Sequence, residues 1–446
     1  MSLKHPQLLC SLNFELKTLL AEFEPEFTHL TKSLVYEKIT RSSKPLFGNL
    51  SFSKWSLFPI KNRLLIKNTV AEEKREPFDY ITSENDNEVH WYPNFADYYL
   101  FGFYSGPLLA QDELQVLEHP SLGSLRQALI HDTSLPKNAT PLTRKNGVPT
   151  PVLIYNVPRQ AILDVSPNKE KGRPLGLYGN QFARTNRKVV LDSVSILSPP
   201  TWSNIYAIEA PKYGLGKYTL SQIKEIFSSC YTSFSAACLV SQEEENFGFD
   251  QILYGLENSN QNETEKGKND KEEEKKKDME VENEKKKEKE KEKENENVNE
   301  NENEKEKDNK KSKEKENKKE KEKEKEKEKE ETKENEKEIL DCVEIPRVRK
   351  VPRKVILHLG HWGCGTYGGN KVLMTLLQLL AAKAAGVDNV YYHTFTKIGS
   401  ECFNKGVESL ENLLQEVTEK ENLLNIDKTL KKVEQMNFEW SKSDEN

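Results

Sequence analysis

The chain has 446 residues, with 73 acidic and 67 basic side chains and a formal net charge of −6. Residues 261–340 contain 32 of the acidic and 27 of the basic residues, so the rest of the chain is nearly neutral, with 41 acids and 40 bases. This balance argues against broad electrostatic binding of nucleic acid, which requires a basic surface. The length suffices for two or three domains of average size.

The cysteines and the N-terminal sequence favour a reducing compartment inside the cell. The six cysteines are scattered, and no CxxC or Cys/His spacing predicts a zinc site or a small disulfide framework. The N-terminal sequence MSLKHPQLLCSLNFELK lacks the uninterrupted apolar stretch of a signal peptide, and no segment resembles a membrane span. We therefore expect a nuclear or cytoplasmic protein that does not bind membranes.

Residues 1–85 are predicted to form an N-terminal helical accessory layer. Apolar side chains recur at helix-like spacing within residues 6–40, which indicates one or more amphipathic helices there. These side chains are Leu8, Leu9, Leu12, Phe14, Leu16, Leu19, Leu20 and Phe23.

The segment from Trp91 to Leu122 combines many aromatic residues with the polar triplet Gln111-Asp112-Glu113. Adjacent carboxylates beside apolar residues raise each other's pKa, as burial does, and this produces an acid that can donate a proton near neutral pH. The alternative is that the triplet only opens a helix, where acidic side chains interact favourably with the helix dipole. His119, which precedes a proline, is interpreted as a structural or capping residue.

Residues 123–256 contain short strand candidates and one long helix. Apolar runs at residues 152–155, 189–191 and 205–208 predict strands. A helix is predicted from Thr219 to Val240, because Thr219 and Gln222 form a capping box ahead of an apolar stripe. The aromatic and polar stretch at residues 177–182 is either a lid that stacks on a base or only a loop, and Tyr178 and Phe182 are its candidate stacking residues.

Residues 257–342 consist almost entirely of Lys, Glu and Asn. Such a segment cannot bury a core, and it is predicted to be disordered. We interpret it as an insertion within one domain, because the cost of closing a loop grows only slowly with its length.

Residues 354–395 predict a βαβ unit. An apolar strand is followed by five glycines within residues 360–369, then by a leucine-rich helix that Gly386 ends, and then by a β-rich run. A glycine loop at the carboxyl end of a strand lets backbone N–H groups approach an anion, and the helix dipole adds to the attraction. The loop therefore predicts a cradle for a phosphate or diphosphate.

Two other interpretations of this loop remain open. The spacing Gly363-x-Gly365-x-x-Gly368 fits the dinucleotide fingerprint, although Asp388 stands before the second strand instead of at its end. A tight turn that binds nothing is the third possibility. After the unit, residues 401–446 are predicted to form a helical extension that packs on the core, or alternatively a helix that binds a partner.

Two separated stretches resemble one family, the poly(ADP-ribose) glycohydrolases with a macrodomain fold. Residues 360–369, GHWGCGTYGG, resemble the family's G-N-W-G-C-G-x-F-G-G loop, and the helix and strand that follow are similar as well. Residues 94–113 are similar to the family's D-F-A-N, glycine triplet and Q-E-E sequence, with equal spacing from first to last.

The resemblance implies an α/β fold with a macrodomain-like mixed sheet flanked by helices. Residues 86–256 and 343–400 would be the two parts of one glycohydrolase domain. The implied activity is hydrolysis of ribose–ribose bonds in poly(ADP-ribose), with Glu113 as the general acid beside Asp112 and without a metal or cofactor. The implied partners are poly(ADP-ribose) or ADP-ribosylated proteins. The substrate-binding residues that the resemblance implies are Asp97, Gln111, Gly102, Gly363, Cys364, Gly365, Tyr367 and Gly368.

The sequence departs from the family pattern at several of these positions. The glycine triplet falls on Phe101-Gly102-Phe103, Asp97 replaces an asparagine, Asp112 replaces the first glutamate and Tyr367 replaces a phenylalanine. The changed glycine loop supports an alternative function, a module of the same fold that binds ADP-ribose or its polymer without cleaving it.

Deletion of residues 261–340 is expected to leave folding and ligand binding intact, because the segment cannot contribute to a core. Thermal unfolding of the deleted protein, followed by circular dichroism, should remain a single cooperative transition. Loss of that cooperativity would show that the charged run is part of the folded structure.

Overall fold

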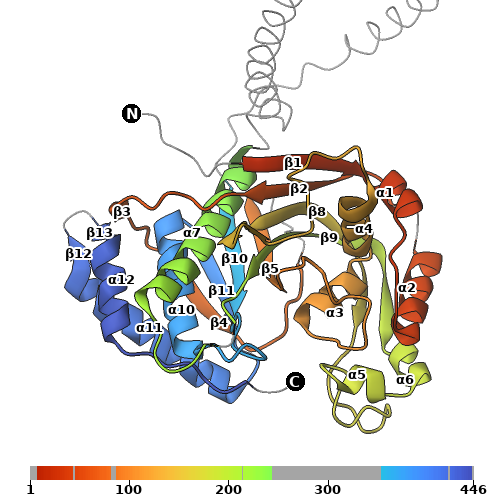
Figure 1. Cartoon of the computed structure of the whole chain (residues 1–446). Coiled ribbons are helices and arrows are strands. Elements are labelled where there is room, and N and C mark those ends of the chain that lie inside the picture. The colour runs from red at the N-terminus through yellow and green to blue at the C-terminus, as the bar shows by residue number, and fades with distance from the viewer. Residues whose placement is uncertain are drawn as a thin grey trace, which may run out of the picture. The chain divides into compact units, whose positions relative to one another are not determined.

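The structure is a computed structural model, and it describes residues 8–43, 46–81, 87–212, 214–243, 353–419 and 422–443 (Figure 1). The predicted disordered insertion at residues 257–342 lies outside the described residues. The residues on either side of that gap belong to one compact unit, which contains all the described elements. The boundaries of the predicted domains stay predictions.

An eight-stranded mixed sheet forms the centre of this unit. Four strands at one side pair antiparallel with one another, and the other four strands continue the sheet in parallel pairing. The strand order is β1 (Leu8–Glu15), β2 (Asn49–Trp55), β8 (Val152–Leu163), β9 (Val194–Glu209), β5 (Glu88–Ala96), β10 (Lys354–Gly360), β11 (Asn389–His393) and β4 (Val70–Lys74). Small two- and three-stranded sheets use β3 (Arg63–Leu65), β6 (Arg144–Lys145), β7 (Val148–Pro149), β12 (Thr418–Glu419) and β13 (Leu423–Asn425).

Helices cover both faces of the sheet (Figure 1). One face carries the largest apolar core and is covered by α7 (Leu220–Glu243), α10 (Lys371–Ala385), α11 (Lys397–Val417) and α12 (Ile426–Gln435). The helices at the other face are α1 (Leu16–Glu22), α2 (Leu30–Ser42), α3 (Gln111–Glu118), α4 (Ser121–His131), α5 (Gln181–Arg184) and α6 (Arg187–Asp192). The mixed sheet flanked by helices confirms the predicted α/β class. The described residues before residue 85 are not only a helical layer, because β1, β2 and β4 belong to the central sheet.

The central βαβ unit forms for reasons that are local in the sequence. The Asn370 side chain accepts hydrogen bonds from the backbone N–H groups of Val372 and Leu373, which starts α10. Gly386 takes the left-handed conformation with a φ of 79°, which ends the helix. The leucines of α10 are buried between the sheet and α7 and α11. The predicted helix after Thr219 is confirmed too, and its capping box is formed.

Two sequence predictions of secondary structure are wrong. Residues 8–15 form the strand β1 instead of a helix, because they pair antiparallel with β2, more than thirty residues further on. Residues 189–191 belong to the short helix α6, not to a strand. The side chain of Asn186 accepts a hydrogen bond from the N–H of Lys188, and this cap favours a helix over the β-branched preference of the valines.

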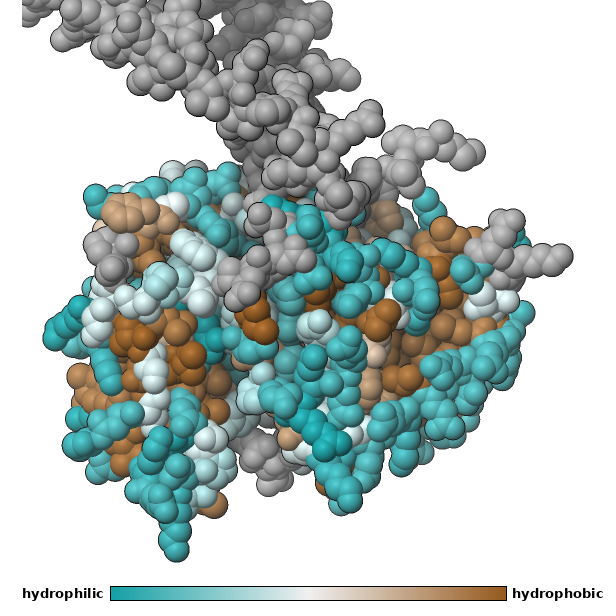
Figure 2. All heavy atoms as spheres, turned by 180° about the vertical axis from the view of Figure 1, so that it is seen from behind, coloured by the Kyte–Doolittle hydropathy of each residue, from teal (hydrophilic) through white to brown (hydrophobic). Residues whose placement is uncertain are grey.

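Among the described residues, no helix combines the length and the apolar character that a membrane span requires. From behind, hydrophilic side chains separate several hydrophobic areas of the surface (Figure 2). Exposed apolar side chains are normal on protein surfaces, and by themselves they do not define an interaction site.

Replacement of Leu376 by alanine is expected to lower the free energy of unfolding by about 2–5 kcal/mol, because the side chain is fully buried in α10 and its loss leaves a cavity. Urea unfolding measures the change. Ile398→Ala in α11 is the control, because Ile398 is 66% exposed and its truncation should change stability by less than about 1 kcal/mol. Equal losses in the two variants would contradict the assigned core.

Candidate active site at the carboxyl edge of the sheet

The parallel strands β9, β5, β10 and β11 all end at one edge of the sheet. Ala96 at the end of β5 pairs with Glu209 at the end of β9, and Gly360 at the end of β10 pairs with His393 at the end of β11. In open α/β sheets, ligands bind in the crevice at this carboxyl edge. Asp97 and the predicted glycine loop follow β5 and β10 directly at this edge.

The predicted glycine loop follows β10 directly and is tied back to the sheet. The indole N–H of Trp362 donates to the carbonyl oxygen of Ile208 in β9 at 3.1 Å. Inside the loop, the N–H of Gly369 donates to the oxygen of Gly363 at 2.9 Å, and the N–H of Gly368 donates to the oxygen of Gly365 at 3.0 Å. The loop is thus a closed turn with a fixed shape.

Two of the predicted substrate-binding glycines are required by packing. Gly363 and Gly368 have φ values of 69° and 70°, in the left-handed region that favours glycine. A Cβ atom at Gly363 would lie 2.4 Å from the Cβ of Ala210, and one at Gly368 would lie 2.6 Å from the oxygen of Ser441. The C-terminal segment therefore braces the loop, and the N–H of Ser441 donates to the oxygen of Gly368 at 2.8 Å.

The other loop residues differ in whether their polar groups are free to bind a ligand. Cys364 is buried, and its thiol donates to the oxygen of Trp362 at 3.4 Å. Among the residues that the structure describes, no hydrogen-bond acceptor is found for the backbone N–H groups of Gly365 and Thr366. Thr366 is exposed and Gly365 is half-buried. These two N–H groups are available as anion donors.

Asp97 connects the end of β5 to the glycine loop. Its Oδ2 accepts hydrogen bonds from the hydroxyl of Tyr367 at 2.7 Å and from the ammonium group of Lys212 at 2.6 Å. Burial acts to raise the pKa of Asp97, but the hydrogen bonds from Lys212 and Tyr367 outweigh it and hold the pKa below its usual value. Burial, together with the same bond and nearby carboxylates, raises the pKa of Tyr367, so the hydroxyl keeps its proton.

Lys212 extends this link into a network of charges at the strand ends. Its ammonium group lies 3.2 Å from Glu209, which also binds Arg144 at 2.6 Å, and Arg144 binds Glu225 at 2.6 Å. Sequence analysis missed Lys212 and Arg144. The available signal for Lys212 was its place just after the carboxyl end of a predicted strand, where binding residues tend to lie.

The polar triplet opens α3, as the alternative interpretation held. Gln111 is its first residue, and its side chain accepts from the N–H of Phe95 and donates to the oxygen of Pro93, both at 2.9 Å. The Glu113 side chain is buried, and its Oε2 accepts from the N–H of Ala110 at 2.7 Å. The first turn of α3 is thereby fixed against the end of β5.

Asp112 has the environment that the sequence predicted for an acid. Burial and the adjacent charge of Glu113 raise its pKa well above the ordinary value of a carboxyl group. Asp112 is also one of the charges that raise the pKa of Tyr367. The start of α3 and the glycine loop, which are far apart in the sequence, therefore influence each other at the same edge of the sheet.

The remaining predicted residues lie elsewhere or serve packing. Gly102 sits in a tight turn in which its N–H donates to the oxygen of Tyr99 at 2.7 Å, and an added Cβ would lie 2.8 Å from the Cβ of Tyr99. Phe182 is 1% exposed and packs in a core cluster, whereas Tyr178 is 45% exposed. His119 caps the end of α3 and binds Gln115 and Ser203, which confirms its structural role.

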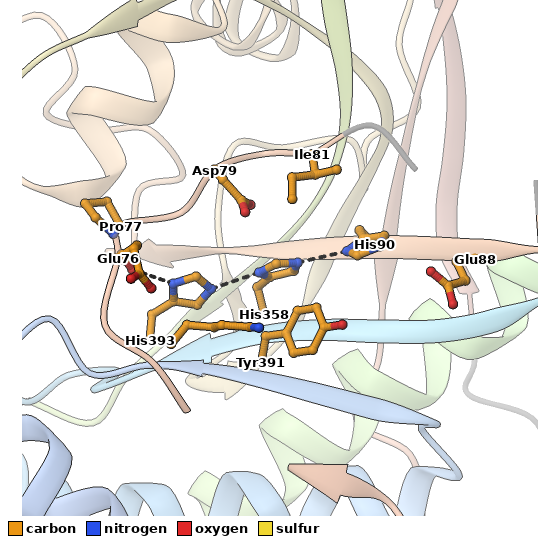
Figure 3. A pocket seen from close by; sticks show the side chains of 10 residues that line it. Glu76, Pro77, Asp79, Ile81, Glu88, His90, His358, Tyr391 and His393 are labelled. Atoms are coloured by element: carbon orange, nitrogen blue, oxygen red, sulfur yellow. Dashed lines mark hydrogen bonds between the residues drawn. The ribbon is translucent and has the colours of Figure 1, made fainter. Parts of the chain in front are cut away.

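A separate cavity of about 590 Å³ lies on one face of the parallel strands (Figure 3). A row of three histidines crosses it: His90 from β5, His358 from β10 and His393 from β11. The ring nitrogens of His90 and His358 are 3.0 Å apart, and those of His358 and His393 are 2.9 Å apart. Sequence analysis did not single out these residues.

One backbone carbonyl sets the tautomers of the whole row. Nδ1 of His393 lies 2.7 Å from the oxygen of Glu76, which can only accept, so His393 is protonated at Nδ1. When the rings are neutral, His393 then accepts at Nε2 from Nδ1–H of His358, which in turn accepts from Nδ1–H of His90. Burial lowers the pKa of each ring, so the neutral row is the stable form. Within the described part of the chain, no group of His, Cys, Asp and Glu has the arrangement of a metal site.

One family model matches part of this chain. The family model described as poly(ADP-ribose) glycohydrolase (PARG), macro domain fold, matches residues 268–401, which include the glycine loop but not Asp97 or α3. None of the curated proteins matches. Similar solved structures include two crystal forms of Deinococcus radiodurans poly(ADP-ribose) glycohydrolase in complex with ADP-ribose. The first is 10% identical with a TM-score of 0.34 and covers 89% of this chain and 97% of that chain. The second is 12% identical with a TM-score of 0.29 and covers 90% and 95%.

The histidine row predicts a loss of stability on mild acidification. The pKa values of these histidines are lowered in the folded protein, whereas histidines in the unfolded chain have a pKa of about 6.5. The unfolded state therefore binds more protons below that pH. The free energy of unfolding, measured by urea titration between pH 7.5 and pH 5, should therefore fall as the pH falls below about 6.5. In His358→Gln, which removes one of these groups, the decrease should be shallower.

The exposed His131 at the end of α4 provides the control, and His131→Gln should keep the wild-type pH dependence. The comparison uses the slope with pH, so a constant loss of stability in His358→Gln does not affect it. An unchanged slope in His358→Gln would contradict the neutral, buried row.

Proposed function

We propose that this chain, a divergent member of the poly(ADP-ribose) glycohydrolase family, hydrolyses the ribose–ribose glycosidic bonds of poly(ADP-ribose) and releases ADP-ribose. One observation carries the proposal: the hydroxyl of Tyr367 donates to Oδ2 of Asp97 at 2.7 Å. This bond joins the glycine loop to the segment that leads into the acid pair of α3. Neither the glycine loop nor the acid pair alone would indicate a glycosidase.

The glycine loop supplies the proposed diphosphate contacts. The N–H groups of Gly365 and Thr366 have no acceptor among the described residues, and such N–H groups hold phosphate oxygens without any charged side chain. Two of the first N–H groups of α10, those of Val372 and Leu373, are less available, because the Asn370 side chain already accepts from them. The loop, and not the helix end, therefore provides the donors. Lys212, close to Asp97, adds a positive charge at the same edge.

The acid pair supplies the proposed chemistry. Glu113 donates a proton to the oxygen of the leaving ribose while the bond from that oxygen to the anomeric carbon breaks and positive charge develops on the sugar. A water molecule then attacks the anomeric carbon, and Glu113 takes up the proton that the water loses. Asp112 stands beside it, and the raised pKa of Asp112 favours a state in which the pair together holds one proton.

A binding module of the same fold is the second candidate, and the turn at Gly102 favours it. In place of three glycines, Phe101 is buried with a φ of 53°, and Phe103 is exposed. Side chains at these positions limit how closely backbone can approach a ribose or a phosphate. Such a protein would bind ADP-ribose or ADP-ribosylated proteins without releasing a product.

Hydrolysis of purified poly(ADP-ribose), with chromatographic detection of ADP-ribose, tests the proposal. Wild type is expected to release ADP-ribose, and Glu113→Gln should reduce the rate by roughly 100-fold or more, because it removes the general acid. The glutamine oxygen can still accept from the N–H of Ala110, so the start of α3 should stay folded. ADP-ribose affinity, measured by calorimetry, should change much less.

Controls and alternatives are resolved in the same assay. Glu170→Gln, at an exposed glutamate, should behave as wild type. Asp112→Asn is expected to lose less activity than Glu113→Gln, and the reverse order would move the acid role to Asp112. Binding of ADP-ribose without turnover would favour the binding module. Binding of NAD without affinity for ADP-ribose would support a dinucleotide enzyme instead.

A further inference from the structure

Lys32 is a fully buried cation beside the proposed active site. It lies in α2, is 0% exposed, and shares the buried side of that helix with Val35, Tyr36 and Ile39. Burying an ammonium group costs several kcal/mol unless other groups replace its hydration. The hydrogen-bond partners and nearby charges of Lys32 must therefore replace its hydration.

Two backbone carbonyls accept from Lys32. Its Nζ donates to the oxygen of Tyr104 at 2.9 Å and to the oxygen of Leu108 at 2.5 Å. These carbonyls belong to the short segment that leads into α3, and two residues after Leu108 the N–H of Ala110 binds Glu113. The N–H of His29, just before α2, also holds this segment by donating to Ser105 at 3.0 Å. The start of α2 thus fixes the approach to the acid pair.

The acid pair at the start of α3 supplies the negative charges that act on Lys32. Burial lowers the pKa of Lys32 to about 8, and the charges of Glu113 and Asp112 act in the opposite direction. In return, the Lys32 charge counteracts the rise in the pKa of Asp112. Two other titratable groups near Lys32 are His29, just before α2, and Tyr104 in the segment, and neither carries a negative charge near neutral pH.

We propose that Lys32 is a positioning residue for the reaction: it fixes the segment from Tyr104 to Leu108, and its charge keeps one carboxylate of the Asp112–Glu113 pair ionised while the other carries the proton. The inference rests on the proposed function for its catalytic consequence. Two carboxylates compensated by one ammonium group leave a net charge of −1, and one shared proton neutralises it. The pair is therefore poised to give and take back a single proton.

Lys32→Met removes the charge and the two hydrogen bonds. We expect kcat for polymer hydrolysis to fall by roughly 10- to 100-fold, with KM changed less than about threefold. The acidic limb of the kcat profile should move up by about one pH unit, because an opposite charge nearby lowers a carboxyl pKa by about that much. Lys32→Gln, which keeps a hydrogen-bond donor without the charge, should fold and show the same shift.

Lys38→Met is the matched control. Lys38 lies on the same helix and also donates to two backbone carbonyls, those of Leu191 and Val194, at 2.6 and 3.2 Å. This variant should keep the wild-type pH profile. An equal shift in Lys38→Met would mean that loosening of α2 is the cause. An unshifted profile in both Lys32 variants would overturn the proposal.

An NMR titration separates this proposal from the proposed function, because it needs no turnover. The ε-carbon resonance of Lys32 reports its pKa directly in wild type and in Asp112→Asn and Glu113→Gln. Removal of either carboxylate should lower the pKa of Lys32. A Lys32 pKa that does not change in either variant would refute the charge coupling, whether or not the protein hydrolyses the polymer.

Discussion

The shared edge at which β9, β5, β10 and β11 end is the constraint on which the rest of this structure depends. It brings Asp97 and Tyr367, 270 positions apart in the sequence, to within 2.7 Å. Parallel pairing makes this possible, since all four strands run in one direction and the residues that follow them meet in one place. Only this arrangement brings the glycine loop and the start of α3 to the same edge of the sheet.

The charged side chains of the site compensate one another. Asp97, Lys212, Glu209 and Arg144 alternate in sign along the strand ends, so each charge that leaves water has an opposite partner. Lys32 is buried in α2, and its charge acts on the acid pair. A buried pair of carboxylates without a cation would be hard to ionise at all, and a pair with too much positive charge could not hold a proton. One cation for two carboxylates lies between these limits, and this ratio suits acid–base chemistry.

Several residues that are proposed to act at the site also stabilise the fold. Gly363 and Gly368 are needed because Ala210 and Ser441 lie where a side chain would be. Gln111 and Glu113 hold α3 against β5 through backbone hydrogen bonds. These roles agree with a preorganised site, in which groups that contact a ligand are fixed before it arrives. They also mean that activity measurements on such variants need a parallel measurement of folding.

The sequence by itself determined the elements whose signals are local. The βαβ unit was predictable from its apolar strand, its glycines and the Gly386 terminator, and the helix after Thr219 was predictable from its capping box. The acid pair and the glycine loop were singled out by residue type and by resemblance to a family. Lys32 is visible in the sequence as a lysine within the apolar stripe of α2, but the sequence does not show which groups lie near it.

Tertiary structure decided everything that depends on pairing between distant residues. Residues 8–15 have helix-like spacing, yet they form β1 because β2 offers backbone hydrogen bonds that no local pattern records. The Asp97–Tyr367 bond, the Lys212 network and the histidine row arise in the same way, from strands that become neighbours only in the folded sheet. Local preferences are worth a few tenths of a kcal/mol per residue, whereas a buried charge without a partner costs several, so the distant contacts determine the site.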